Sequence, residues 1–224
     1  MTKLFSSLFA LLVASATSFA SAQAPAQPAP AAGGGPAIEA KVAMCIGCHG
    51  IPGYQSSFPE VHRVPMISGQ GGKYIAAALT AYKNGERKHP SMRGIGAGLS
   101  DQDITQISAW YEAQAKGGAA PSEQPRQPNA QVAALLQKGG CVACHGANFN
   151  KPIDPTYPKI AGQHKDYLFV ALKAYKADGS VVGRSNGLMG GVVKQFSNAE
   201  LKAMANYVGS LDGQLITQPQ SRFR

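Results

Sequence analysis

The string Cys45-Ile46-Gly47-Cys48-His49 recurs as Cys141-Val142-Ala143-Cys144-His145, and the two copies use all four cysteines of the 224-residue chain. Cys-x-x-Cys-His is the attachment motif of c-type haem. Two cysteines three positions apart lie on one helical turn, where each can form a thioether, and the adjacent histidine then lies under the iron. The sequence therefore predicts two covalently bound haem c groups, attached through Cys45, Cys48, Cys141 and Cys144, with His49 and His145 as iron ligands.

Other uses of paired cysteines fit this chain less well. A zinc site made of two Cys-x-x-Cys pairs has about 15–20 residues between them, far fewer than here. A thioredoxin-like dithiol needs a βαβ context and no following histidine. A disulfide between two cysteines so close in sequence would restrain the unfolded chain very little.

The N-terminus predicts export. Lys3 precedes the apolar stretch from Leu4 to Ala14, and Ala20-Ser21-Ala22 matches the small-x-small pattern of signal peptidase sites. We expect a signal peptide over residues 1–22, cleaved near Ala22, and a periplasmic mature protein, with loose association to the membrane surface left open. Residues 23–37 are an Ala/Pro/Gly spacer without an apolar pattern.

An internal repeat extends far beyond the cysteine motifs. Pro65-Met66-Ile67-Ser68-Gly69-Gln70 matches Pro158-Lys159-Ile160-Ala161-Gly162-Gln163, and each copy leads into a helical pattern. Later, Ser100 and Ser197 each open a capping box before an amphipathic helix. We expect an all-α protein with two domains, residues 38–115 and 130–212, joined by a Pro-containing linker, residues 116–129, and followed by a basic tail, residues 213–224.

The sixth iron ligand decides whether a haem transfers electrons or binds and transforms a small molecule. Alignment of the two halves separates the candidates among the six methionines. Met1 is the start residue, Met44 lies beside Cys45, Met66 has no counterpart in the second half, and Met204 lies on an apolar helical stripe. Met92 and Met189 remain, at matching positions in glycine-rich loops. We predict that they are the distal iron ligands.

Three further histidines compete for that role. His62, His89 and His164 do not recur in the other half, so each is interpreted as a surface or loop residue, with His89 kept as a bis-histidine alternative in the first half. The carbonyls of Pro65 and Pro158 are candidate acceptors for the haem histidines. Arg87 and Arg184 are candidates to pair with haem propionates, and a solvated surface charge is the alternative for both.

The formal net charge of +9 favours redox partners with acidic docking surfaces, such as a membrane oxidase or a dehydrogenase. No run of Lys and Arg is dense enough for nucleic-acid binding, so no nucleic-acid partner is expected.

Taken together, these motifs resemble the dihaem cytochrome c4 family over nearly all of the mature chain. The resemblance implies two class I cytochrome c domains with haems close together across their interface. It also implies a periplasmic electron carrier without catalysis of its own, working toward a terminal oxidase, as a monomer or within a redox complex. The chain departs from the family pattern in residues 50–64, where a shorter loop is expected; this departure bears on the partner surface.

Two other functions stay open. One is the electron-accepting subunit of a periplasmic dehydrogenase, as in flavocytochromes that oxidise sulfide. The other is a dihaem peroxidase, which needs one open iron position and is disfavoured by two recurring methionines.

Overall fold

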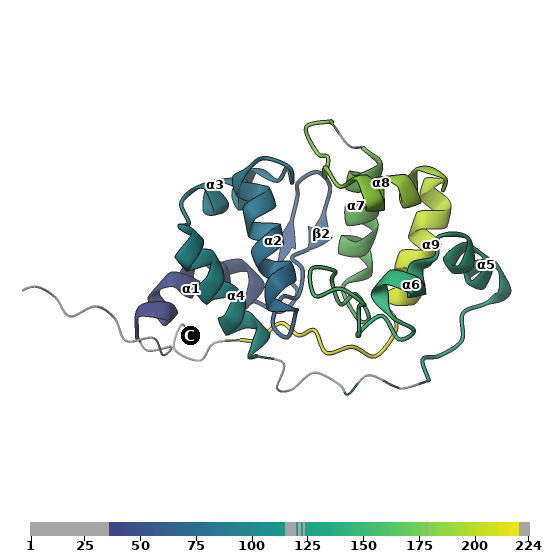
Figure 1. Cartoon of the computed structure of the whole chain (residues 1–224), viewed down its shortest axis with the longest axis horizontal. Coiled ribbons are helices and arrows are strands. Elements are labelled where there is room, and N and C mark those ends of the chain that lie inside the picture. The colour runs from purple at the N-terminus through teal and green to yellow at the C-terminus, as the bar shows by residue number, and fades with distance from the viewer. Residues whose placement is uncertain (1–35, 115–119, 121, 123, 178, 220–224) are drawn as a thin grey trace, which may run out of the picture. The chain divides into compact units, whose positions relative to one another are not determined.

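The computed structural model describes residues 36–114, 120, 122, 124–177 and 179–219. The predicted signal peptide and almost all of the spacer lie outside these residues. The described residues belong to one compact unit, Gly33–Arg224. Their helices are α1 Pro36–His49, α2 Gly72–Lys83, α3 Pro90–Ala97, α4 Asp101–Glu112, α5 Ala130–Lys138, α6 Cys141–His145, α7 Lys165–Lys176, α8 Gly187–Lys194 and α9 Asn198–Val208 (Figure 1).

The repeat is visible in how the helices pack. In the first half α4 packs on α1 and α2, and in the second α9 packs on α5 and α7. Each of these last helices begins with the predicted capping box. Ser100 accepts the Asp103 backbone N–H and Asp103 accepts that of Ser100, and Ser197 and Glu200 do the same. The predicted all-α fold class is confirmed.

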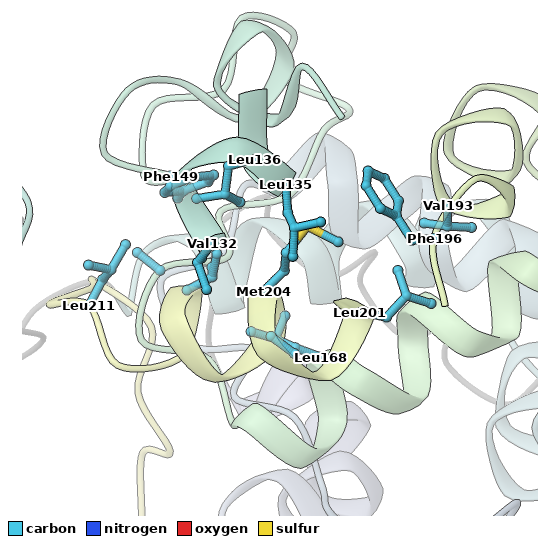
Figure 2. Packing of buried hydrophobic residues seen from close by; sticks show 13 residues of the cluster. Val132, Leu135, Leu136, Phe149, Leu168, Val193, Phe196, Leu201, Met204 and Leu211 are labelled. Carbon is cyan, nitrogen blue, oxygen red and sulfur yellow. The ribbon is translucent and has the colours of Figure 1, made fainter. Parts of the chain in front are cut away.

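Each half has its own apolar core. The second core joins residues from α5, α7, α8 and α9, with Phe149, Phe196 and Leu201 almost fully enclosed. Figure 2 shows Phe196 beside Val193 and Leu201, and Met204 at the centre of the cluster. The core position predicted for Met204 is therefore confirmed.

The two haem motifs sit differently on their helices. Helix α1 runs without a break from Pro36 to His49, so the last two residues assigned to the spacer are helical. In the second half the helix ends at Lys138, and Gly140 has a left-handed φ of 59° before the short α6 carries the motif. Glycine adopts that conformation at little cost, whereas the first half has Ala43-Met44 at this point and stays helical.

The methionine segments are helices, so the expectation of loops was wrong. Met92 lies in α3 and Met189 in α8. His89 caps the first helix by accepting the Met92 backbone N–H, and Asn186 caps the second by accepting that of Met189. Both methionines therefore lie in the first turn of a capped helix, which restricts where their side chains can reach.

Residues 50–64 contain a small hairpin of strands β1 Gln55–Ser56 and β2 His62–Arg63. It contacts α7 of the second half, where Arg63 bonds Asp166 at 3.0 Å and Glu60 pairs with Lys173. The chain after α9 also returns to the first half, because the Ile216 N–H donates to the carbonyl of Ser68 and Leu215 is buried. The beginning of the segment assigned to a basic tail thus packs against protein.

Candidate functional site

A cavity of about 570 Å³ is lined by both halves of the repeat. Its walls include His49 and Met92 from the first half and His145 and Met189 from the second. Most of the remaining wall is apolar, as expected for a pocket that encloses a porphyrin. Cys48, Cys141 and Cys144 line the same cavity, while Cys45 packs against the first core. The structure thus brings the predicted ligand pairs to a shared interior space.

The two motif histidines are held in the same way. His49 Nδ1 lies 2.8 Å from the carbonyl oxygen of Pro65, and His145 Nδ1 lies 3.0 Å from that of Pro158. A carbonyl only accepts, so Nδ1 carries the proton in each ring and Nε2 remains for a metal. Burial lowers the pKa of both histidines, which favours the neutral imidazole that binds iron.

The first cysteine of each motif, Cys45 or Cys141, is half-buried, whereas Cys48 is exposed. All four are free of disulfides. Burial raises the pKa of the Cys45 thiol to about 11 and also raises that of Cys141. Reactive dithiols and zinc ligands need a stabilised thiolate, which the surroundings of Cys45 and Cys141 disfavour. Among the described residues no three His, Cys, Asp or Glu side chains are grouped to hold a metal ion.

The competing histidines have other roles. His62 is buried, with 4% of its surface exposed, so its prediction as a surface or loop residue was wrong; it lies in β2, where Nδ1 bonds the carbonyl of Glu60. His89 uses Nδ1 for the Met92 N–H and Nε2 for Ser56 Oγ, so both ring nitrogens already have partners. His164 precedes α7 and is half-buried.

The two arginines are buried where the halves meet. Arg87 and Arg184 are each 8% exposed, and their backbones pair in an antiparallel bridge. Both donate to the Tyr167 hydroxyl, at 3.5 and 3.3 Å. Their guanidinium groups also lie over tyrosine rings. A solvated surface charge, the alternative considered from the sequence, does not describe these positions.

Within the part of the chain that the structure describes, neither buried cation has a carboxylate partner. The four ion pairs among the described residues include neither arginine, and Arg87 Nε has no hydrogen-bond partner. An uncompensated charge is costly to bury. Anionic propionates at this wall of the cavity would supply the missing partners, so the donor set fits haem.

Tyr167 is a residue whose role the sequence did not reveal. Burial opposes its ionisation, but Arg184 and Arg87 lower the pKa of its hydroxyl to about 8. Burial raises the pKa of its counterpart Tyr74, which receives a hydrogen bond from Arg87. The recurrence of this tyrosine in both halves was visible, but its position between the halves was not.

Comparison with known proteins agrees with this geometry. A protein-family model for cytochrome c matches residues 129–212. Cytochrome c4 of Stutzerimonas stutzeri is 30% identical over 194 residues, covering 81% of this chain and 90% of the relative. The chain belongs to the cytochrome c4 family. The cytochrome c4 structure from Acidithiobacillus ferrooxidans is 26% identical, covers 76% of this chain and 99% of that one, and superposes with a TM-score of 0.60.

Family membership establishes the general character of the protein. It is an electron-transfer cytochrome built of class I cytochrome c domains, and it binds haem c covalently, with Cys-x-x-Cys motifs at 45–48 and 141–144. Another relative of the same chain, from Stutzerimonas stutzeri, is named a thiosulfate dehydrogenase electron acceptor; it is 28% identical over 174 residues, 75% of this chain and 78% of the relative. No helix among the described residues is long and apolar enough to cross a membrane.

Proposed function

We propose that this cytochrome is a periplasmic carrier that passes single electrons between a respiratory donor and a terminal oxidase or similar acceptor. The observation that supports this most directly is the position of one histidine and one methionine from each half in the wall of the same cavity. When bound, haem supplies a one-electron couple, and His/Met ligation favours a raised potential. If each histidine and methionine pair binds an iron as proposed, neither site would keep a place for substrate.

The chain's own residues then have separate tasks. Cys45 and Cys48 hold one group and Cys141 and Cys144 the other through thioethers. His49 with Met92 ligates the first iron, and His145 with Met189 ligates the second. Pro65 and Pro158 orient the histidines, and Arg87 with Arg184 compensates the propionates.

Each half is proposed to be one domain of this carrier, residues 38–115 and 130–212, with residues 116–129 between them. Residues 1–22 are proposed to direct export and to be cleaved near Ala22. The predicted export agrees with the chemistry, because haem is attached to c-type cytochromes outside the cytoplasmic membrane.

Docking is proposed to use the second half, whose surface is more basic. Residues 130–212 contain nine Lys and Arg against five Asp and Glu, whereas residues 38–115 contain seven against six. Lys138 lies over the Phe196 ring at 5.0 Å, and Lys176 donates to the Phe196 carbonyl. Lys202 is exposed on α9, and Lys194 ends α8 two residues before Phe196.

This basic patch lies close to the second haem site and is not repeated in the first half. A Cβ on Gly139 would meet both Cys141 Sγ and the Phe196 ring within 3.4 Å, so the phenylalanine adjoins the attachment cysteine. In the first half Lys83 is paired with Asp101 at 3.0 Å, and the position that matches Asp101 in the second half is Asn198. Lysines beside one haem, without the ion pair that Lys83 makes in the first half, would guide an acidic partner to it.

A second candidate is the electron-accepting subunit of a dehydrogenase, favoured by the relatives named thiosulfate dehydrogenase electron acceptors. Co-purification with a dehydrogenase, and faster reduction by that enzyme than by a quinol-linked donor, would support this reading.

The experiment that tests the carrier is a redox titration of the purified protein followed by optical spectroscopy. We expect two one-electron steps and the far-red band of methionine-ligated ferric haem, lost stepwise in the variants Met92→Ala and Met189→Ala. Turnover of peroxide at rates typical of an enzyme would contradict the proposal.

The docking surface has a separate test. We expect the double variant K138Q/K202Q to slow electron transfer to an acidic copper protein such as plastocyanin about tenfold at low salt. The matched variant K73Q/R93Q removes the same charge from the first half and should change the rate far less. Equal slowing by the two variants would mean that net charge, and not this patch, attracts the partner.

A further inference from the structure

Gln70 and Gln163 reach across from one half to the other. Both are 3% exposed and end the repeated segments 65–70 and 158–163. Gln70 accepts the Lys159 backbone N–H and donates to the Lys159 carbonyl, both at 2.9 Å. Gln163 accepts the Met66 N–H at 3.0 Å and donates to the Met66 carbonyl at 2.9 Å. Each side-chain amide thus satisfies both backbone groups of one residue in the other half.

Each glutamine bonds the residue that directly follows a proline, and the carbonyl of that proline accepts a hydrogen bond from a haem histidine. The Met66 N–H and the Pro65 carbonyl belong to one planar peptide group, and that carbonyl accepts His49 Nδ1–H at 2.8 Å. Because the peptide is planar, a bond that fixes its N–H also fixes the direction of its carbonyl. Hydrogen bonds in series also polarise one another in a buried setting. Gln163 therefore acts on His49 through a single peptide group.

The second half repeats the arrangement with the roles exchanged. The Lys159 N–H shares its peptide with the Pro158 carbonyl, which accepts His145 Nδ1–H at 3.0 Å. Gln70 therefore acts on His145 in the same way.

The glycine before each glutamine sets the direction in which the glutamine side chain points. Gly69 and Gly162 have φ values of 85° and 73°, a left-handed conformation that favours glycine. The Gly69 N–H donates to the carbonyl of Tyr111 in α4, and the Gly162 N–H to that of Val208 in α9. Each glutamine is thus anchored in its own half while its amide group bonds in the other.

We propose that Gln163 is a positioning residue for His49 and Gln70 for His145, so that each haem histidine is oriented by the opposite half. This inference rests on the proposed ligation by these histidines. A histidine that donates a strong Nδ1–H bond is a more basic ligand and stabilises the oxidised iron. Loss of the glutamine weakens that bond and raises the midpoint potential of the haem in the other half.

The mirrored variants Gln70→Ala and Gln163→Ala test this, because each serves as the control for the other. A redox titration of the holoprotein followed by NMR separates the two sites through the methyl signals of Met92 and Met189. We expect Gln70→Ala to raise the midpoint of the second-half haem more than that of the first, and Gln163→Ala to do the reverse.

A second measurement does not depend on the redox chemistry. In Gln70→Ala the Lys159 amide proton should exchange with solvent about five- to tenfold faster, since it has lost a buried hydrogen bond. Gln114→Ala is a matched control: its amide oxygen accepts the Ser68 hydroxyl within the first half. It should leave both the Lys159 exchange rate and the second midpoint unchanged.

The inference is overturned if each variant shifts the midpoint of its own half more than that of the other, or if neither midpoint moves while the Lys159 exchange accelerates. If the wild-type protein itself shows no reversible one-electron steps, the proposed function fails before this question arises.

Discussion

The helices that carry the two methionines offer a matched test of how they are positioned. Gly96 in α3 and Gly190 in α8 are both buried helical glycines. A Cβ on Gly96 would lie 3.1 Å from the backbone nitrogen of Lys83 and 3.3 Å from the carbonyl oxygen of Leu79. A Cβ on Gly190 would meet only the carbonyl oxygen of Tyr175, at an ordinary 3.5 Å.

The same substitution should therefore have opposite effects in the two halves. Replacing a helical glycine by alanine gains up to about 1 kcal/mol of helix propensity. Gly190→Ala should keep much of this gain. At Gly96 the added methyl group meets the backbone of α2, which cannot rotate away, and overpacking of this kind costs about 1–3 kcal/mol. The net result for Gly96→Ala is a loss of about 0–2 kcal/mol.

Chemical denaturation of the holoprotein measures the free energy of unfolding of both variants. The difference between them cancels the propensity gain and reports the crowding alone. The far-red methionine band provides a second readout, because α3 must move away from α2 and carry Met92 with it; we expect the band of the first haem to weaken. The reasoning fails if Gly96→Ala is as stable as Gly190→Ala and leaves the band intact.

Three further outcomes are expected. Ser197→Ala should remove about 1 kcal/mol from the free energy of unfolding by breaking the capping box of α9, as denaturation will measure. Asp166→Asn should weaken the half-exposed pair with Arg63 and cost up to about 1 kcal/mol in the same assay, leaving both midpoint potentials unchanged. Lys41 and the Ser100 cap lower the pKa of Asp103 from 3.8 to about 2. Because a depressed carboxyl pKa stabilises the folded state above pH 4, this contribution to the free energy of unfolding should disappear between about pH 4 and 2. Asp103→Asn should remove that part of the acid dependence.

The sequence predicted the features that repeat. Two haem motifs, two capping boxes and two aligned methionines needed only comparison of one half with the other. The helical start signals were read correctly because Ser100 and Ser197 cap through local contacts, three residues along the chain. Local hydrogen bonds of this kind are encoded within a few residues.

What the sequence did not predict depends on contacts between distant segments. His62 was interpreted as a surface or loop residue because nothing near it in sequence shows that β2 packs against α7. The methionine segments were expected to be loops because they are rich in glycine. In the structure Gly96 instead lets α3 approach α2 closely. Both packing arrangements join segments that lie far apart along the chain, so local sequence patterns do not reveal them.

Comparison of the two halves distinguishes residues that both copies keep, where the halves meet, from surface residues that differ between them. Contacts at the meeting of the halves are reciprocal: Gln70 and Gln163 each bond the backbone of the opposite half, and the backbones of Arg87 and Arg184 pair with each other. Loss of either glutamine would leave a buried backbone N–H and carbonyl of the other half without their partner, so both copies keep this residue. The outer surfaces carry no such constraint. Lys83 of the first half is paired with Asp101, whereas the position that matches Asp101 in the second half is Asn198. This difference between the two outer surfaces is what the proposed docking through the second half requires.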